Sequence, residues 1–321
     1  MGKILITGAC GQIGSELVLK LQEIFGNSFI IPTDIKEPFG LSERPKNFHY
    51  LDVLDQDKLD TVVTRYEVDS IFHMAAILSA LGERNPQLAY KVNMQGLINV
   101  LEVARRNQVK KVLMPSSIAV FGPDVPADNT PNYTPLNPTT MYGVTKVAGE
   151  KLLQYYFKKY DIDTRSLRYP GIISSETEPG GGTTDYAVDL YVEAVSGHPY
   201  NCYIKSDTAL PFMYMPDAIK AIIDLYNADS NNLTSRVYNV GAMSLTPNDL
   251  IQSIQKYIPE FNCSFKPDYR QKIAESWPHS IDDSLARNDW SWKPEYGLDT
   301  MTEDMITKLK SRINNNDLIN R

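Results

Sequence analysis

The 321-residue sequence is poor in cysteine and contains no long apolar run. Its three cysteines, Cys10, Cys202 and Cys263, lie far apart, and no Cys-x-x-Cys pair or cysteine–histidine cluster occurs. This spacing argues against a structural zinc site and a disulfide framework, and it favours a reducing compartment. No segment reaches the roughly 20 apolar residues that a membrane-spanning helix needs. The formal net charge of -7 disfavours a polyanionic partner.

These absences predict a protein with neither a nucleic-acid partner nor a membrane segment. An expected strand begins at Lys3, which leaves no room for a signal peptide before it. We therefore expect a cytoplasmic location. The mitochondrial matrix would be the alternative if a targeting segment had been removed.

Short apolar runs alternate with longer amphipathic stretches over the first half of the chain. Strands are expected at 3–7, 28–34, 47–52, 70–74, 111–115 and 164–168. Helices are expected at 12–25, 56–66, 86–107 and 141–160. This alternation predicts an α/β fold with a doubly wound parallel sheet covered on both faces.

The rhythm breaks after Tyr169, where a glycine-rich loop at 178–184 precedes an expected helix at 185–196. A helix at 213–227 and a strand at 236–240 are expected to return to the main sheet. A further helix at 246–257 begins with Thr246 as its N-cap and Pro247 in its first turn. We predict a large domain from 1–170 with 206–242, a smaller discontinuous C-terminal lobe from 171–205 with 243–310, and a frayed tail at 311–321.

A glycine-rich turn separates the first expected strand from the first expected helix. It contains Gly8, Gly11 and Gly14, with Gln12 and Ile13 between the last two. Such glycines allow a tight turn, close approach of backbone N–H groups to a pyrophosphate, and close packing of helix on strand. The helix N-terminus adds its positive dipole end. This context predicts a Rossmann dinucleotide-binding domain, formed by the larger of the two units.

The end of the second expected strand carries an acidic residue, Asp34, twenty positions after Gly14. Its carboxylate can accept hydrogen bonds from both ribose hydroxyls and would repel a 2′-phosphate. Asp34 therefore favours NAD over NADP, although Lys36 nearby offers a positive charge.

Two further strand ends are candidates for cofactor contacts. Asp52 and Val53 follow the third strand, where a carboxylate can meet the adenine amino group. A helix N-cap or turn aspartate is an equally good interpretation of Asp52. Ala75 and Ala76 follow the fourth strand, and their small side chains let the backbone pass close to a dinucleotide.

A hydroxyl-rich strand end is followed by a tyrosine–lysine pair. Ser116 and Ser117 end the fifth expected strand, and Tyr142 and Lys146 lie four residues apart on the following helix, so that both face the same side. A phenol with an ordinary pKa near 10 needs about 3 pH units of depression, or roughly 4 kcal/mol, to act as phenolate at neutral pH. A nearby ammonium and a positively charged nicotinamide ring both favour the anion.

Together these features resemble the extended short-chain dehydrogenase/reductases, and more narrowly the epimerase-like L-threonine 3-dehydrogenases. The similarity extends over nearly the whole chain. It rests on the serine loop 116–122, on Arg168-Tyr-Pro-Gly-Ile172, on the glycine–threonine loop 180–186, and on the stretch 276–287. Nucleotide-sugar epimerases typically carry Asn near the position of Gly171, which makes a nucleotide-sugar substrate less favoured.

The resemblance implies NAD-dependent, zinc-independent oxidation of the L-threonine β-hydroxyl to 2-amino-3-oxobutanoate, a step of threonine catabolism. It implies that Tyr142 is the base, that Lys146 holds the ribose hydroxyls and lowers the pKa of Tyr142, and that Ser117 binds the reacting oxygen with help from Ser116. It also implies that Ile172 lies beside the nicotinamide.

The same resemblance supplies candidates for binding the amino-acid end of the substrate. They are Ser79, Gly182, Thr183, Thr184 and Trp277, in addition to Ser117 and Tyr142. Ordinary structural roles remain open for them: a helix N-terminal serine, a flexible glycine turn and a core tryptophan.

The family also implies a homodimer in which the helices containing 88–104 and 144–160 pair across a two-fold axis as a four-helix interface. The alternative is that their apolar residues only cover the sheet. Two other functions stay open: a nucleotide-sugar epimerase or dehydratase of the same fold, and a non-catalytic NAD-binding sensor.

Overall fold

The computed structural model describes residues 2–37, 47–177 and 180–314. The α-helices are α1 (Gln12–Phe25), α2 (Gln56–Tyr66), α3 (Ser79–Arg84), α4 (Pro86–Tyr90), α5 (Gly96–Arg106), α6 (Met141–Tyr160), α7 (Tyr186–Ser196), α8 (Met215–Asn227), α9 (Pro247–Gln255), α10 (Tyr269–Ala274), α11 (Ser284–Trp290) and α12 (Leu298–Asn314). The strands are β1 (Lys3–Thr7), β2 (Ile30–Asp34), β3 (His49–Tyr50), β4 (Val68–His73), β5 (Lys111–Leu113), β6 (Ser116–Ser117), β7 (Asp163–Tyr169), β8 (Gly171–Ile173), β9 (Tyr200–Cys202), β10 (Leu210–Tyr214), β11 (Val237–Asn239), β12 (Met243–Leu245) and β13 (Cys263–Phe265).

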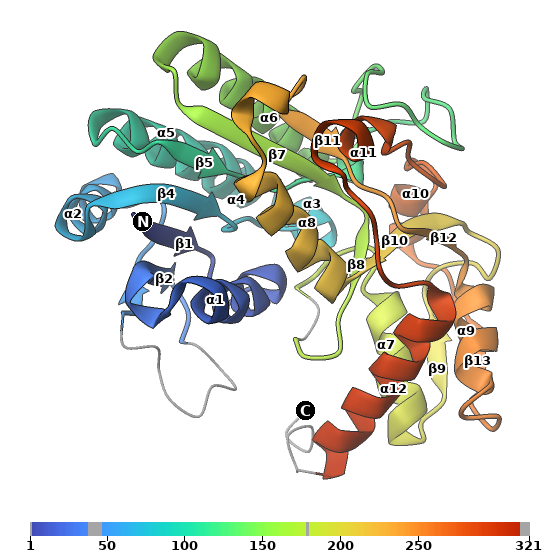
Figure 1. The fold of residues 1–321 in the computed structure, drawn as a ribbon. Helices are drawn as coiled ribbons and strands as arrows, with labels where there is room; N and C mark the ends of the chain where they lie inside the picture. The colour runs from blue at the N-terminus through green and yellow to red at the C-terminus, as the bar shows by residue number, and fades with distance from the viewer. Residues whose placement is uncertain (1, 38–46, 178–179, 315–321) are drawn as a thin grey trace.

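A parallel sheet forms the centre of the upper part of the molecule in Figure 1. Its strand order is β11-β7-β5-β4-β1-β2-β3, and β6 also pairs with β7. Every pair in this sheet is parallel. The order reverses direction at β1, so consecutive βα units wind outwards from it in both directions. This arrangement confirms the predicted Rossmann-like α/β fold.

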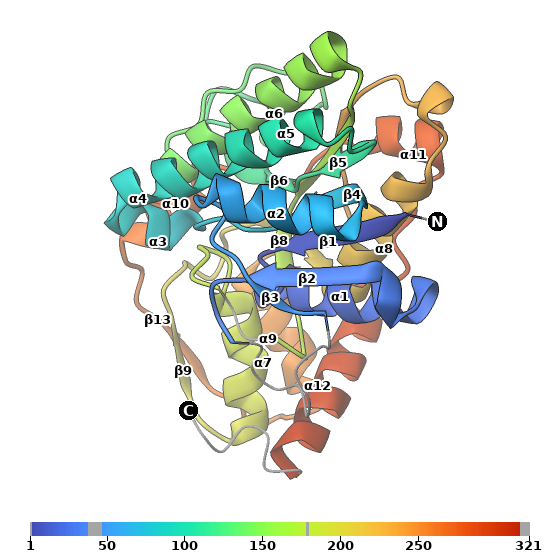
Figure 2. The same cartoon turned by 90° about the vertical axis from the view of Figure 1, so that its left-hand side faces the viewer.

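The two faces of the sheet bury separate apolar clusters. Ile4 and Ile6 of β1 belong to a cluster with residues of α1, α8 and α11, whereas Leu5 belongs to one with α2, α5 and α6. Alternate residues of a strand point to opposite faces, which explains this division. Figure 2 shows the same arrangement, with α2, α5 and α6 on one side of the sheet and α1 and α8 on the other.

Three of the predicted helices, α1, α2 and α6, have the predicted bounds. Other predicted elements differ in detail. The segment 28–34 begins in a 3-10 turn (Asn27–Phe29), and only two residues of 47–52 form β3. The predicted helix 86–107 is divided by a π-helical turn at Lys91–Gln95, which separates α4 from α5. A π turn inserts one residue into a helix and often marks a functional region.

The lower part of the molecule in Figure 1 contains α7, α9, α12 and the short pair β9–β13. The predicted start of α9 is confirmed: Thr246 and Asp249 form a reciprocal capping box, and Pro247 occupies the first turn. The predicted helix from 213 was wrong at its start, because Met213 belongs to β10, between β8 and β12. The strand at 236–240 returned to the main sheet, as expected, as β11.

The end of the chain differs from the frayed tail predicted at 311–321. Helix α12 continues to Asn314, so residues 311–314 are helical, and 315–321 lie outside the described residues. Its inner side buries Met301, Met305 and Leu309, and this packing holds the last turns. The predicted domain boundaries remain a prediction.

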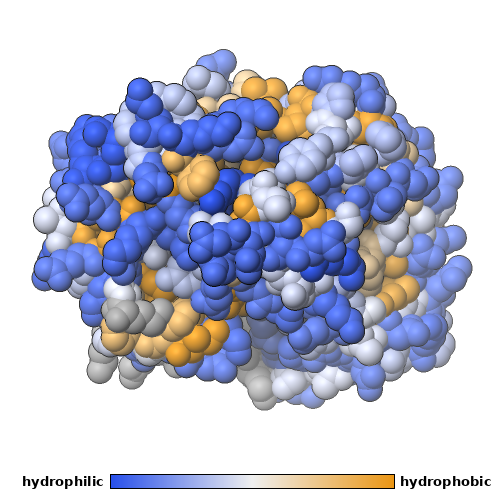
Figure 3. Space-filling model, turned by 45° about the horizontal axis from the view of Figure 1, so that its top comes forward, coloured by the Kyte–Doolittle hydropathy of each residue, from blue (hydrophilic) through white to orange (hydrophobic). Residues whose placement is uncertain are grey.

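The surface seen in Figure 3 is mostly hydrophilic, with apolar side chains in scattered patches. Over the described ranges, none of the helices combines the length and apolar character required to cross a membrane.

Candidate active site

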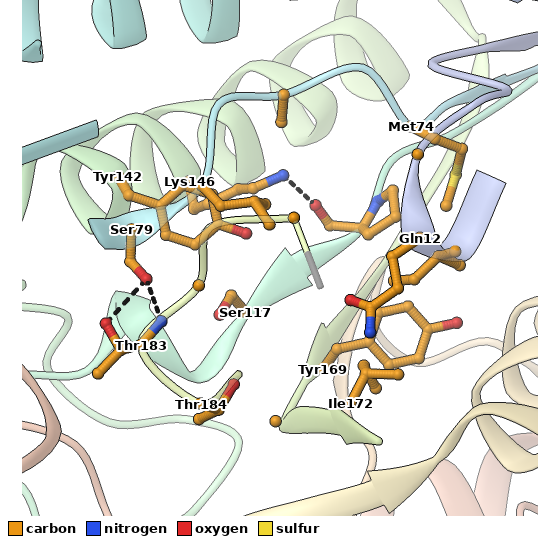
Figure 4. A pocket seen from close by; sticks show the side chains of 18 of the residues that line it. Gln12, Met74, Ser79, Ser117, Tyr142, Lys146, Tyr169, Ile172, Thr183 and Thr184 are labelled. Carbon is orange, nitrogen blue, oxygen red and sulfur yellow. Dashed lines mark hydrogen bonds between the residues drawn. The ribbon is translucent and has the colours of Figure 1, made fainter. Parts of the chain in front are cut away.

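A pocket lies at the carboxyl ends of β1, β4, β6 and β8, where open α/β sheets bind ligands. Its volume is about 240 Å³. Figure 4 shows side chains that reach it from the glycine turn, from α6 and from the 180–185 loop. Most of the predicted site residues are among those that line it: Gly8, Gly11, Gln12, Ile13, Gly14, Ala76, Ser79, Ser116, Ser117, Tyr142, Lys146, Ile172, Gly182, Thr183, Thr184 and Trp277.

The glycine turn is packed too closely for side chains. Gly8 has φ +68°, and a Cβ there would lie 2.5 Å from the backbone nitrogen of Ala75. A Cβ on Gly14 would lie 2.1 Å from the carbonyl oxygen of Gly8. Gly11 caps α1 without any side-chain hydrogen bond, and the first turn contains no acidic residue. The N-terminal amides of α1 and its positive dipole end are therefore available to an anion.

An unsatisfied donor in the same region also fits a bound dinucleotide. The side-chain nitrogen Nε2 of Gln12 is buried and has no hydrogen-bond partner among the described residues. Figure 4 shows the Gln12 amide close to Tyr169 and Ile172. A buried donor without a partner costs about 1–3 kcal/mol, which a polar ligand would offset. The glycine turn and Gln12 thus suit a dinucleotide with its phosphates at the start of α1.

Asp34 lies beside the glycine turn at the end of β2, outside the group of residues that line the pocket. Its carboxylate accepts a hydrogen bond from the backbone nitrogen of Cys10 at 2.9 Å and another from that of Lys36 at 3.0 Å. A carboxylate has about four acceptor positions, so two remain for ribose hydroxyls. The role of Asp34 in selecting NAD stays a prediction.

Asp34→Ala is expected to weaken NAD binding by roughly ten-fold or more, since charge-assisted hydrogen bonds are worth about 1.5–3 kcal/mol. NADP binding should weaken less, because the variant also removes a repelling charge. Titration of the purified protein with each cofactor measures both effects. An unchanged ratio of the two affinities would contradict the predicted role.

Three predicted cofactor residues do not reach the pocket. Asp52 is exposed and accepts a hydrogen bond from Leu54 N at 2.9 Å, which is the turn interpretation of this residue. Val53 is buried against Gly96 and its carbonyl accepts from Asn99. Ala75 packs against the glycine turn, one residue before the pocket-lining Ala76.

Tyr142 and Lys146 project from one side of α6 into the pocket (Figure 4). The Lys146 Nζ lies 5.4 Å from the centre of the Tyr142 ring and donates to the carbonyl oxygen of Pro115 at 2.6 Å. Helix α6 begins at the right place for this because the Thr140 hydroxyl accepts from Gly143 N and caps it.

Burial dominates the proton affinities of this pair in the ligand-free protein. It raises the pKa of Tyr142 to about 12, while a hydrogen bond with Ser117 acts in the opposite direction. Burial also lowers the pKa of Lys146 to about 8, and the negative charge of Glu150 opposes this shift. The expectation that Lys146 by itself makes the phenol acidic is therefore not met by the protein alone. A further positive charge has to enter the site.

The histidine nearest to this pair is neutral. Burial and the nearby Lys146 charge lower the pKa of His73 to about 3. Its Nδ1 forms a 2.8 Å hydrogen bond with the Thr7 hydroxyl, within the sheet. His73 therefore holds two strands together at the base of the pocket and has no proton to give at neutral pH.

The two serines of β6 have different surroundings. The Ser117 hydroxyl accepts from Ala119 N at 3.2 Å and interacts with Tyr142. The Ser116 hydroxyl instead donates to the buried carboxylate of Glu150 at 2.6 Å. Ser117 is thus the serine whose hydroxyl is available to a substrate oxygen next to Tyr142.

The predicted substrate residues form a second wall. The Ser79 hydroxyl accepts from Thr183 N at 3.2 Å and bonds the Thr183 hydroxyl at 3.0 Å, as Figure 4 shows. Trp277 lines the pocket and is almost fully buried. The structure therefore brings these residues together, and their contacts with a substrate remain a prediction.

Asp185 is a pocket residue that the sequence analysis missed. It accepts from the backbone nitrogens of Gly181 and Gly182 at 2.9 and 2.7 Å, and burial raises its pKa to about 6. Its position two residues after the predicted Thr183 was the available signal. The other lining residues not predicted are Lys36, Met74, Leu78, Pro115, Ile118, Tyr169, Pro170, Gly171 and Gly180.

Comparison with known proteins gives concordant results. The model of the NAD dependent epimerase/dehydratase family matches residues 4–241. An uncharacterized epimerase/dehydratase of Staphylococcus saprophyticus is 49% identical over 315 residues, which cover 97% of this chain and 98% of the relative.

Two solved structures are also similar over nearly their full length. An L-threonine dehydrogenase from Phytophthora infestans has 52% identity and a TM-score of 0.94, covering 97% of this chain and 100% of the other. A GalE-like L-threonine dehydrogenase from Cupriavidus necator, in its holo form, has 49% identity and a TM-score of 0.92, covering 96% and 100%.

Proposed function

The chain belongs to the NAD-dependent epimerase/dehydratase family, and we propose that within it the protein is an L-threonine 3-dehydrogenase. It would oxidise the β-hydroxyl of L-threonine to give 2-amino-3-oxobutanoate, with NAD as the hydride acceptor. The observation that carries the proposal is the meeting of two sets of residues in one pocket. The glycine turn lines one part of it, and Ser117, Tyr142 and Lys146 line another.

The proposed reaction needs one proton acceptor and one hydride acceptor at the same carbon. When bound, oxidised NAD accepts the hydride and adds positive charge beside the phenol. Tyr142 then takes the hydroxyl proton, the C–H bond breaks to release the hydride, and the C–O bond becomes a carbonyl. Proton transfer of this kind typically contributes about 10²–10⁴-fold to the rate.

The other residues of the set would position and stabilise these atoms. The Ser117 hydroxyl would bond the reacting oxygen, and the Lys146 ammonium would bond the ribose hydroxyls and favour the phenolate. Lys146 is anchored by Pro115, which directs its Nζ along the pocket. Ile172 on β8 would pack against the nicotinamide, because it lines the pocket between the glycine turn and the substrate wall.

The shape of the pocket supports a small substrate. A Cβ on Gly171 would lie 2.7 Å from the Phe212 ring and 2.9 Å from the Thr184 methyl carbon, so this position has no room for the Asn typical of nucleotide-sugar epimerases. Ser79, Gly182, Thr183, Thr184 and Trp277 would bind the amino-acid end of threonine. The relatives of about 50% identity support the same substrate, since two of them are L-threonine dehydrogenases.

The test is a direct assay of the purified protein with NAD and L-threonine, following NADH by absorbance. We expect NADH to form with L-threonine and not with a UDP-sugar. Interconversion of UDP-sugars without threonine oxidation would instead identify an epimerase. Tight NAD binding with no turnover of either substrate would identify a sensor.

We further propose that the protein is a homodimer through α4, α5 and α6. The support is a group of exposed apolar side chains on two of these helices, Leu88, Tyr90, Val144 and Tyr155, each more than 40% exposed. Large exposed apolar groups on neighbouring helices are typical of interfaces. Light scattering that gives twice the chain mass would support this assembly, and a concentration-independent monomer would contradict it.

A further inference from the structure

A buried acidic side chain next to the catalytic set has no role in the mechanism above. Glu150 lies on α6, one turn after Lys146, and is 1% exposed. Its carboxylate accepts from Arg168 at 2.8 Å through both oxygens, and one of these oxygens also accepts from the Ser116 hydroxyl at 2.6 Å. A buried ion pair of this kind is costly to form and gives little net stability, so its presence calls for another explanation.

The partners of Glu150 lie on the two strands that deliver the serine to the pocket. Ser116 is paired with Arg168, and Ser117 with Tyr169, in the register of β6 and β7. Successive residues of a strand point to opposite faces. Ser116 and Arg168 therefore point towards Glu150 on α6, while Ser117 and Tyr169 line the pocket.

The short strand β6 is thus attached to α6 at two successive residues. Lys146 donates to the carbonyl of Pro115, and Glu150 accepts from Ser116. Arg168 is itself held by the carbonyl oxygen of Asn132 at 2.8 Å and lies over the Phe121 ring. The carboxylate cannot turn away from Ser116 without leaving Arg168 unpaired.

We propose that Glu150 is a positioning residue of the active site: fixed by Arg168, its carboxylate anchors Ser116 and so sets the place of Ser117 relative to Tyr142 and Lys146 on the same helix. This role rests on the proposed dehydrogenase function. It assigns Ser116 an anchoring role in place of the direct assistance that the family resemblance implied.

Glu150 also places a negative charge close to the catalytic pair. The groups that face Lys146 are Tyr142 and Glu150 on α6 and the neutral His73 on β4, and Arg168 on β7 faces Glu150. A nearby negative charge favours the protonated form of both an ammonium and a phenol. Removing it is expected to lower the pKa of Lys146 and that of Tyr142 together.

The most selective variant is Ser116→Ala, because it cuts the anchor and leaves the ion pair intact. We expect kcat to fall about ten- to a hundred-fold, since small displacements of reacting groups cost rates of this order, with NAD affinity unchanged. Ser116→Thr keeps the hydroxyl and should retain most of the activity. Ser253→Ala is the matched control: it removes another buried serine hydroxyl, bonded to Thr302 in α12, and should leave kcat unchanged.

A second variant, Glu150→Gln, tests the charge. The acidic limb of the kcat–pH profile is expected to move to lower pH, a shift that loss of packing alone would not produce. The Tyr142 phenol can also be titrated without substrate, in the NAD complex, as tyrosinate absorbance minus that of Tyr142→Phe. A lower pKa of Tyr142 in Glu150→Gln than in the wild type is the expected result.

These measurements separate the two proposals. A wild type that does not oxidise threonine would overturn the proposed function, and the tyrosinate titration would still test Glu150. Wild-type activity in Ser116→Ala, or equal losses in Ser116→Ala and Ser116→Thr, would overturn the anchoring role. If Glu150→Gln does not fold, the serine pair and its Ser253→Ala control decide the question.

Discussion

Tyr142→Phe is expected to abolish detectable threonine oxidation, lowering kcat by at least about 10²–10⁴-fold, while NAD binds almost as in the wild type. The variant removes one oxygen, and with it the proposed proton acceptor. The fold should tolerate the change, because the ring remains and the hydroxyl interacts only with Ser117 within the site. Stopped assays with NAD and L-threonine, together with NAD titration, measure the two quantities.

Tyr191→Phe is a matched control for this prediction. It removes another buried phenol hydroxyl, which bonds Thr302 at 2.7 Å in the packing between α7 and α12. It is expected to cost about 1 kcal/mol of unfolding free energy without changing kcat. A Tyr142→Phe protein with more than a few per cent of wild-type activity would show that another group takes the proton.

The direction of the pH dependence follows from the same tyrosine. In the ligand-free protein, burial raises the pKa of Tyr142 to about 12, so the phenol is protonated at neutral pH. Positive charge from bound NAD has to lower it before the phenolate can act. The rate is therefore expected to rise with pH through the neutral range, and the phenol should titrate at lower pH with NAD than without it.

Local signals were sufficient to predict the elements that carry most of the site. The helices α1 and α6 have the predicted bounds, because Gly11 and Thr140 mark their starts and each helix has a regular apolar face. The order of the strands followed from the βα alternation. Those two facts brought the glycine turn, the serines of β6 and the Tyr142–Lys146 pair to one edge of the sheet.

What the sequence could not provide depended on tertiary contacts. Asp52 was expected near the adenine, but its side chain bonds Leu54 N within the turn that precedes α2. Strand β10 was missed because its run is continuous with the apolar face of α8 and gains its partners, β8 and β12, from distant segments. The link from Ser116 to Glu150 joins residues 34 positions apart and has no local signature.

The second large effect is expected for Gly14→Ala, which should both destabilise the protein and weaken NAD binding by more than ten-fold. Gly14 is buried in the first turn of α1, and a Cβ there would lie 2.1 Å from the Gly8 carbonyl oxygen and 3.1 Å from the Ala9 Cα. These are backbone atoms, so the turn itself has to move. Overpacking of this kind typically costs about 1–3 kcal/mol. Thermal unfolding and NAD titration measure the two losses.

Gly11→Ala separates the packing of the turn from its contact with the cofactor. A Cβ on Gly11 would meet only the Gly8 carbonyl oxygen, at 3.3 Å, and its φ of -79° is open to any residue. The apo protein should therefore unfold close to the wild-type temperature. NAD binding should still weaken, because Gly11 lines the pocket at the N-terminus of α1, where the pyrophosphate would approach. A Gly11→Ala protein that binds NAD with wild-type affinity would show that the phosphates do not lie against this turn.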